Sequence, residues 1–336
     1  MPDEEEMTGE DSLIKAYFAP LAAEFPGSFG LQDDCAALTP EPGHDLVLNT
    51  DAIAEGVHFL PGDAPEDIAW KAVAVNVSDI AAKGAKPVAY LISIAFPRMP
   101  ERAWLAGLAA GLGDAQRKLG IALAGGDTDR RPNAPLSVTV MAIGTVLSGR
   151  MVRRNGGQPG DIVYVSGTLG DSALGLRLRS GAIPPERVAR VDPEHRAALE
   201  GRYLRPQPRI ALQTALLDCA SAAMDISDGL VKDLGRLCRA SGVGADVRAD
   251  RIPLSNAAQA VLATVDDLGL LPLMGGDDYE ILACVAPGNA AAFEDQARHA
   301  GVRITAIGTL RKPAGVSVID ARGQTMDLTV AGYDHF

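Results

Sequence analysis

Hydrophobic and polar positions along the first half of the chain predict a long buried helix over residues 63–87. Apolar side chains recur there at helical spacing, at Trp70, Val73, Val77 and Ile80. Pro65 suits the first turn of this helix, and Gly84 suits its end. Asp79 falls in the stripe beside the apolar one, so we expect its carboxylate at the edge of the buried face, where it needs a partner.

The same reading predicts helices and strands in mixed order in both halves of the chain. Helices are expected over 11–22, 100–120, 168–181, 194–204, 256–265 and 289–301. Strands are expected over 46–48, 88–97, 121–124, 135–147, 161–167, 245–254, 279–285, 302–310 and 315–320, and a strand that turns into a helix is expected around MDISDG (224–229). The polar segment 148–161 is the candidate boundary between two domains, 1–148 and 149–336, each α/β or α+β in class.

The composition is consistent with two globular domains, and it disfavours some classes of binding partner. Hydrophobic residues make up 47% of the chain, and aromatic residues only 4%. The net charge of −12 disfavours duplex nucleic acid and anionic membranes as partners. No apolar run approaches the roughly 20 residues of a membrane span, and the first residues are acidic, so a cytoplasmic location is expected. The four cysteines lack metal-ligand spacing and are expected to be buried thiols.

Acidic residues recur at turns beside predicted strands, in NTD (49–51), GGDT (125–128), MDISDG (224–229) and GGDD (275–278). Because open α/β sheets collect ligands at the carboxyl ends of their strands, we expect NTD, GGDT and MDISDG to follow strand ends and to converge. Taken singly, each acid could serve a turn, and Asp228 could cap a helix for ~1 kcal/mol. Taken together, two carboxylates ~4 Å apart repel by about 4 kcal/mol at an effective dielectric of ~20, which a cap does not offset. Oxygen ligands without His or Cys suit Mg²⁺, and such a site favours phosphoryl transfer.

Other nucleotide-binding motifs are absent from the sequence. It contains no GxxxxGK[ST], no GxGxxG after a strand and no protein-kinase set. None of the five histidines forms a pair at short spacing. Nucleotide binding would therefore depend on glycine turns, metal ions and a few cations, of which Arg153 and Arg154 are candidates, although an exposed arginine pair is more often only solvated.

Nine motifs together resemble the thiamine-monophosphate kinase family of the aminoimidazole-ribonucleotide synthetase-like superfamily. They are DDCAAL, NTDAIAEGVHFL, WKAVAVNVSDIAAKGAKP, GGDT, GDIVYVSGTLGDSALGL, GRYLRPQPRI, MDISDGLVKDLG, GGDDYEIL and GYDHF, and they span nearly the whole chain. NVSD and DISDG are shared across the superfamily, whereas EGVHFL and GYDHF are more specific to this family.

This resemblance implies a fold, a reaction and a set of site residues. The implied fold has an N-terminal domain whose sheets pair in a homodimer, followed by a C-terminal α/β domain. The implied reaction is Mg²⁺-dependent transfer of the γ-phosphoryl group of ATP to thiamine monophosphate, by direct in-line transfer. By matching position, the metal set is Asp34, Asn49, Thr50, Asp51, Asp79, Asp127, Asp225 and Asp228. The implied nucleotide contacts are Gly126, Asp127, Arg154 and Ser227, and the implied substrate contacts are His58, Asp277 and Tyr333.

The chain departs from the family pattern at two positions. Gln32 stands where the family usually has glycine, and Asp277 stands where it usually has glutamate, one methylene longer. Three alternatives stay open at this point. They are another activity of the superfamily, such as ring closure or a carbamoyl-dependent maturation step, a non-catalytic metal and nucleotide binder, and a purely structural dimer.

Overall fold

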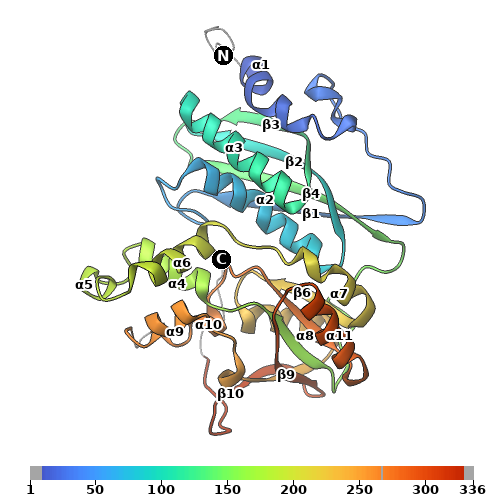
Figure 1. The fold of residues 1–336 in the computed structure, drawn as a ribbon, viewed down its shortest axis with the longest axis vertical. Helices are drawn as coiled ribbons and strands as arrows, with labels where there is room; N and C mark the ends of the chain where they lie inside the picture. Colours follow the sequence, from blue (N-terminus) through green and yellow to red (C-terminus); the bar gives the residue numbers. More distant parts are fainter. Residues whose placement is uncertain (1–9, 266–267, 329–336) are drawn as a thin grey trace. The chain divides into compact units, whose positions relative to one another are not determined.

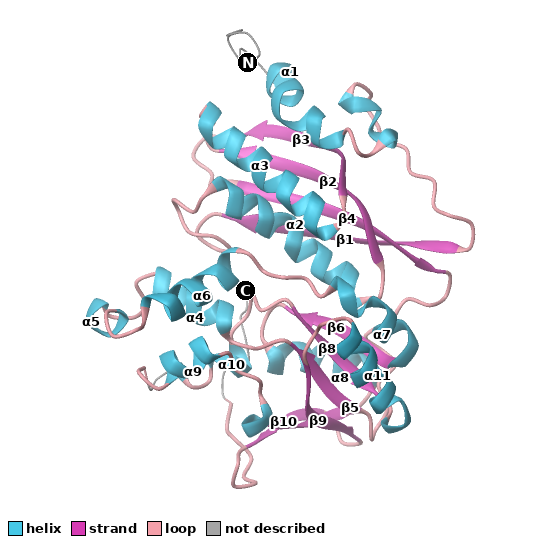
Figure 2. Ribbon diagram, viewed as in Figure 1, coloured by secondary structure: helices cyan, strands magenta, loops and turns pink. Residues whose placement is uncertain are grey.

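The computed structural model describes residues 10–265 and 268–328. It divides into two compact units (Figure 1). The first consists of Met1–Ile80 and Pro87–Thr145, and the second of Ala81–Lys86 and Val146–Phe336. Both units mix helices with strands (Figure 2), which confirms the predicted fold class.

The first unit is built on a four-stranded sheet in the order β1-β4-β2-β3. The strands are β1 His44–Ala54, β2 Lys86–Phe96, β3 Ala122–Arg130 and β4 Ser137–Leu147. Helices α2 (Pro65–Ala82) and α3 (Arg102–Leu119) lie over the same face of this sheet (Figure 1). The apolar stripe predicted for α2 is buried, with exposed fractions between 0% and 2%. The rest of α2 is buried as well, since every residue from Ile68 to Ser78 is buried, and its contacts to β1 come from Asn76 and Asp79.

Two strands of this unit are longer than their sequences predict. The NTD triplet lies inside β1, and GGDT lies inside β3, so the expectation that both follow strand ends is wrong. Pairing with a neighbour explains the difference, because β3 stays in parallel register with β2 as far as Arg130. A ladder of backbone hydrogen bonds can thus extend a strand through polar residues that a hydrophobic pattern reads as its end.

The N-terminal segment before β1 is helical but irregular. A single helix was predicted over 11–22, whereas the chain forms α1 (Glu10–Leu13), a π-helical turn (Ile14–Phe18) and a 3₁₀ turn (Ala19–Ala22). Pro20 lacks an N–H and cannot continue an α-helix, which accounts for the change of helix type. A further 3₁₀ segment covers Pro26–Leu31.

The second unit contains a six-stranded sheet in the order β10-β7-β9-β5-β8-β6. Its strands are β5 Ile162–Ser166, β6 Ala220–Ile226, β7 Gly244–Arg248, β8 Glu280–Val285, β9 Ile304–Arg311 and β10 Gly315–Ile319. The β10–β7 pair is parallel, and the β5–β8, β5–β9, β6–β8 and β7–β9 pairs are antiparallel.

Helices cover both faces of this sheet. One face packs on α8 (Leu230–Ser241), and the other packs on α7 (Gln213–Cys219) and α11 (Ala290–His299). The sequence predicted no helix at α7. Side chains of β5 alternate between the two cores, with Val163 and Val165 on one side and Tyr164 on the other. A third cluster joins α4 (Asp171–Arg179), α6 (Pro193–Leu204) and α9 (Asn256–Leu262), beside the short helices α5 (Pro185–Val188) and α10 (Leu271–Met274).

All four cysteines are free, and three of them, Cys219, Cys238 and Cys284, are buried. Cys35 is exposed, so the prediction of four buried thiols is wrong at that position, which lies in the loop before β1. None of the helices in the described ranges is both long enough and apolar enough to cross a bilayer.

Candidate active site

A polar pair joins the first strand to the first long helix. The Asn49 side chain on β1 donates a hydrogen bond from Nδ2 to Oδ2 of Asp79 on α2, at 2.8 Å. Oδ1 of Asn49 is buried and has no hydrogen-bond partner. Next along β1, Thr50 donates from Oγ1 to the carbonyl of Val140 at 3.0 Å. Two members of the predicted metal set, Asn49 and Asp79, are therefore in contact, with a buried oxygen of Asn49 left unpaired, whereas Thr50 points to the opposite face of β1.

Asp51, the next residue of β1, is held by a buried amide. Its backbone N–H donates to Oδ1 of Asn76 at 2.9 Å, and Nδ2 of Asn76 donates to the Ala72 carbonyl one helical turn earlier. Asn76 is 0% exposed. Because both ends of the Asn76 amide bond backbone groups, this side chain fixes the position of the Asp51 backbone relative to α2.

The loop after β1 places His58 with its ring oriented by the backbone. The Ala54 N–H donates to Nδ1 of His58 at 3.1 Å, and Nζ of the buried Lys71 donates to the His58 carbonyl at 2.8 Å. Since Nδ1 accepts, the proton of the neutral imidazole is on Nε2. His58 is half-buried, so the loop presents one edge of its ring.

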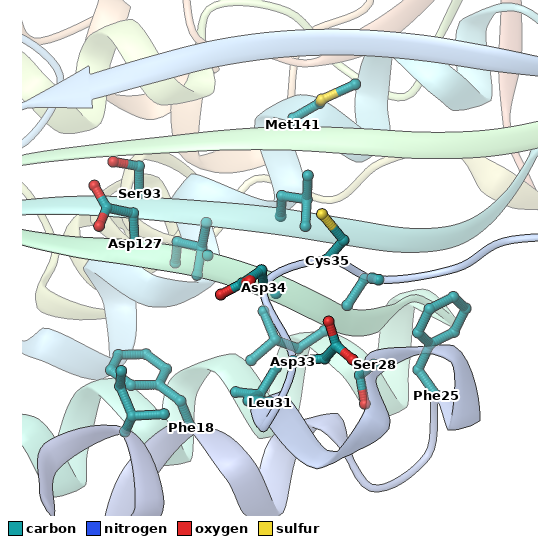
Figure 3. A pocket seen from close by; sticks show the side chains of 18 of the residues that line it. Phe18, Phe25, Ser28, Leu31, Asp33, Asp34, Cys35, Ser93, Asp127 and Met141 are labelled. Atoms are coloured by element: carbon teal, nitrogen blue, oxygen red, sulfur yellow. The ribbon is translucent and has the colours of Figure 1, made fainter. Parts of the chain in front are cut away.

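A cavity of about 740 Å³ in the first unit gathers further predicted residues. Asp34, Gly126 and Asp127 line it, together with Asp33 and Ser93 (Figure 3). Ser93 of β2 is in register with Asp127 of β3. Apolar side chains from the N-terminal segment complete the wall, at Phe18, Phe25 and Leu31. The pocket thus combines an apolar wall with several carboxylates on one side.

Gly126 has a steric reason to be glycine. A Cβ atom at this position would lie 2.0 Å from the carbonyl oxygen of Ile92 on the neighbouring strand. The two strands can keep their spacing only if residue 126 has no side chain, which also leaves its backbone open to the cavity.

Gln32 does not strain the loop that leads to Asp34. Its φ is −107°, which any side-chain-bearing residue can adopt. The left-handed positions of this loop are Phe29, Gly30 and Leu31. The substitution of glycine by Gln32 is therefore compatible with the backbone that the chain adopts.

In the second unit, MDISDG forms the end of β6 and the turn into α8. Asp225 is buried in the last residues of β6, on the same side of the strand as Ala223. The next residues form a turn whose N–H groups point at one carboxylate: Ser227 and Asp228 donate to Oδ2 of Asp233, at 3.0 and 2.9 Å. Asp233 is 0% exposed, and burial raises the pKa of its carboxyl group.

Asp228 is not the cap of α8. The N-cap residue is Gly229, without any side-chain capping bond. The Asp228 carboxylate pairs with Arg236 at 2.6 Å and with Lys232 at 3.7 Å. Arg236 also donates to Asp233 at 2.7 Å, so one guanidinium joins the two acids of this turn.

The GGDD loop packs directly on the MDISDG turn. The Asp277 N–H donates to the Ser227 carbonyl, and the Tyr279 N–H donates to the Ile226 carbonyl, each at 2.8 Å. A Cβ at Gly276 would lie 2.4 Å from the Ser227 carbonyl oxygen, so this close approach requires glycine. The structure therefore brings together Ser227, Asp228 and Asp277, which the resemblance assigns to nucleotide, metal and substrate.

Two predicted site residues, Arg154 and Tyr333, are not among the contacts described so far. Arg154 is exposed, and its carbonyl accepts from Ser241 at the end of α8. Tyr333 lies outside the described residues. Within the described ranges, no three His, Cys, Asp or Glu side chains are close enough to hold a metal ion by themselves.

Several residues that organise the site were not predicted as site residues. Asn76 is one, and its spacing of three from Asp79 on one helix face is a signal that could have indicated it. Asp233, Arg236 and Glu280 are others: the first two contact the nearby Asp228, whereas Glu280 contacts Arg202, which lies 78 residues away in the sequence.

Comparison with known proteins places the chain in a family. The profiles of the N-terminal and C-terminal domains of AIR synthase related proteins match residues 32–146 and 158–321. Thiamine-monophosphate kinase of Escherichia coli strain K12 is 39% identical over 329 residues, which is 98% of each chain.

Two solved structures are also similar to this chain. The crystal structure of thiamine-monophosphate kinase from Stenotrophomonas maltophilia K279a has a TM-score of 0.79 and 38% identity, and the match covers 88% of this chain and 91% of that one. The structure of AaThiL complexed with AMPPCP and TMP has a TM-score of 0.76 and 32% identity, covering 98% and 97%. On these grounds the chain belongs to the thiamine-monophosphate kinase family of AIR synthase related proteins.

Proposed function

We propose that the protein is a kinase that transfers the γ-phosphoryl group of ATP to thiamine monophosphate, giving thiamine diphosphate and ADP. The observation that carries this proposal is the direct bonding of the GGDD loop to the MDISDG turn. It joins the substrate contact Asp277 to Ser227 and Asp228 on one rigid backbone. AaThiL binds an ATP analogue together with TMP, and 98% of this chain aligns with it.

We propose that several Mg²⁺ ions are held by oxygen ligands of each unit. In the first unit these are Asp34, Asn49, Thr50, Asp51, Asp79 and Asp127, and in the second unit Asp225 and Asp228. The unpaired, buried Oδ1 of Asn49 beside the Asp79 carboxylate fits a hard cation, because both atoms are oxygen ligands. Bound there, the ion would neutralise charge on the transferring phosphoryl group.

The proposed transfer is in line and direct. A terminal phosphate oxygen of thiamine monophosphate attacks the γ-phosphorus, the bond from that phosphorus to the β,γ-bridging oxygen breaks, and ADP leaves with the electron pair. The attacking oxygen is already anionic, so no side chain has to remove a proton. Gly126, Asp127, Arg154 and Ser227 would position the nucleotide. His58, Asp277 and Tyr333 would position the acceptor.

The assembly is proposed to be a homodimer in the cytoplasm, where ATP is available. Domain 1–148 would supply dimer contacts and most metal ligands, and domain 149–336 would supply the MDISDG and GGDD loops. The exposed face of the first sheet supports this, since Leu46 and Leu48 of β1 are 39% and 56% exposed at alternate positions.

The test is chromatographic detection of thiamine diphosphate after incubation with ATP, Mg²⁺ and thiamine monophosphate. Product with the monophosphate, but none with free thiamine or after chelation, is the expected result. Binding of ATP without any diphosphate would contradict the proposal and would favour a metal and nucleotide binder without this activity.

A further inference from the structure

The loop that presents Asp277 contains two residues in the left-handed region of the backbone map. Asp277 has φ 68° and Tyr279 has φ 51°, and Asp278 lies between them. Side-chain-bearing residues rarely adopt such angles unless the surrounding structure imposes them. Something beyond the loop itself must therefore hold this conformation.

A buried ion cluster begins directly after the loop. Glu280 is 0% exposed, and its carboxylate accepts from Arg202 at 2.8 Å, from Arg209 Nε at 2.6 Å and from Ser166 Oγ at 2.5 Å. Arg209 also reaches the second carboxylate oxygen through Nη2, which makes this contact bidentate. Both arginines come from the GRYLRPQPRI segment, which follows from α6 toward α7.

The cluster also contacts the loop backbone. Arg202 donates from Nη2 to the carbonyl of Asp278, at 3.3 Å. From the other side, the Gly170 N–H at the start of α4 donates to Oδ2 of the buried Asp278 side chain at 2.8 Å. The residue between the two left-handed positions is thus fixed at its carbonyl and at its side chain.

Stability alone is a weak explanation for this arrangement. A buried carboxylate between two arginines is often no more stabilising than apolar residues of similar volume, because the charges lose their hydration. The bidentate contact from Arg209 fixes the orientation of the Glu280 carboxylate, and hence the position of the residues before Glu280.

We propose that Arg202, Arg209 and Glu280 are positioning residues that set the backbone of the GGDD loop, so that Asp277 is held in the orientation needed to contact the acceptor substrate. This inference rests on the proposed function and deepens it. The three residues act through Asp277 and need not touch either substrate.

The test compares Arg209→Met with Arg248→Met, which removes an exposed ion pair to Asp250 in the same unit. For Arg209→Met we expect the KM for thiamine monophosphate to rise at least tenfold while the KM for ATP changes less than twofold. Arg248→Met should leave both constants unchanged. A parallel rise of both KM values, or no change in either, would overturn the proposal.

A double variant separates positioning from general damage. If Arg209 acts through Asp277, then Arg209→Met combined with Asp277→Ala should be no worse than Asp277→Ala alone. If the effects of the two substitutions multiplied in the double variant, the proposal that Arg209 acts through Asp277 would be refuted. Arg209→Lys serves if the methionine variant fails to fold, because it keeps the charge but loses the fork, and the same selective rise in KM is expected.

Amide hydrogen exchange makes the inference independent of catalysis. The N–H groups of Asp277 and Tyr279 are bonded to MDISDG carbonyls, and both should exchange at least tenfold faster in Arg209→Met than in Arg248→Met. If the wild-type protein makes no thiamine diphosphate, the proposed function fails, and the exchange rates still decide whether the arginines hold the loop. Equal rates in the two variants would overturn the inference.

Discussion

The buried carboxylate of Asp233 accepts a hydrogen bond from the backbone N–H of Asp228 at 2.9 Å, five residues earlier in the chain. The same oxygen accepts from Ser227, so one side chain satisfies two N–H groups of the MDISDG turn. Asp233→Ala should lower the free energy of unfolding by about 2–3 kcal/mol, because it leaves the two N–H donors without an acceptor and removes one of the two carboxylates that pair with Arg236. Urea denaturation would measure this. Asp250→Ala, which removes an exposed partner of Arg248, should leave the free energy of unfolding nearly unchanged, and equal losses would contradict the role assigned to Asp233.

Two aspartates on β3 provide a matched comparison for the cavity. Asp127 lines it, whereas Asp129, two residues further, does not, and its nearest cation is Arg131 at 3.8 Å. We expect Asp127→Asn to lower kcat/KM at least a hundredfold, about 2.7 kcal/mol at the transition state, because the proposed metal and nucleotide ligand would lose its charge. Asp129→Asn should stay within a few-fold of wild type. Similar activities for the two variants would remove Asp127 from the site.

Adjacent glycines of β3 should respond differently to alanine. A Cβ at Gly126 would lie 2.0 Å from a backbone oxygen, while one at Gly125 would meet the flexible Leu91 side chain at 3.2 Å. Gly126→Ala is expected to separate β2 from β3, to lower the thermal midpoint by several degrees and to abolish nucleotide binding. Gly125→Ala should retain nucleotide binding. Calorimetric titration with ATP would measure both variants, and retained affinity in Gly126→Ala would show that the strands can shift without cost.

Leu48 on β1 tests the proposed dimer. Its side chain is 56% exposed on the first sheet, so an aspartate there would place a charge in the interface at a cost of several kcal/mol. Sedimentation of Leu48→Asp should then show monomers at concentrations where the wild type is dimeric. Met99→Asp is the control, since Met99 is 50% exposed but lies in the loop between β2 and α3. A dimeric Leu48→Asp variant would place the contact elsewhere.

Asp278 should give the protein a specific dependence of stability on pH. Burial raises the pKa of its carboxyl group well above the usual value. The folded state then keeps a proton that the unfolded chain releases above about pH 4, so this residue's contribution to stability falls as the pH rises toward the raised pKa. Asp278→Asn keeps an acceptor for the Gly170 N–H and does not titrate. Denaturation at pH 5 and pH 8 should therefore show the variant gaining stability relative to wild type at the higher pH. Parallel changes in both proteins would contradict this.

The sequence predicts much of this architecture because its signals are local. The helical spacing from Trp70 to Ile80 predicts α2 as a buried helix, and Gly120 in the left-handed region ends α3 where the pattern stops. The ends of β1 and β3 were missed because pairing between strands, rather than apolar content, sets them. Resemblance supplied the acids, but the contacts that orient them come from distant segments, as with Arg209 and Glu280, which are 71 residues apart. Such pairs leave no periodic pattern in a single sequence.

Asp277 lies in the left-handed region at φ 68°. This conformation affects how the aspartate here compares with the glutamate that is usual in the family. Aspartate adopts that region several times more readily than most residues, so the shorter side chain loses reach toward a ligand but relaxes the backbone that carries it. The two changes act in opposite directions on one position. Asp277→Glu should therefore lengthen the reach of the side chain while adding strain to the backbone of the GGDD loop.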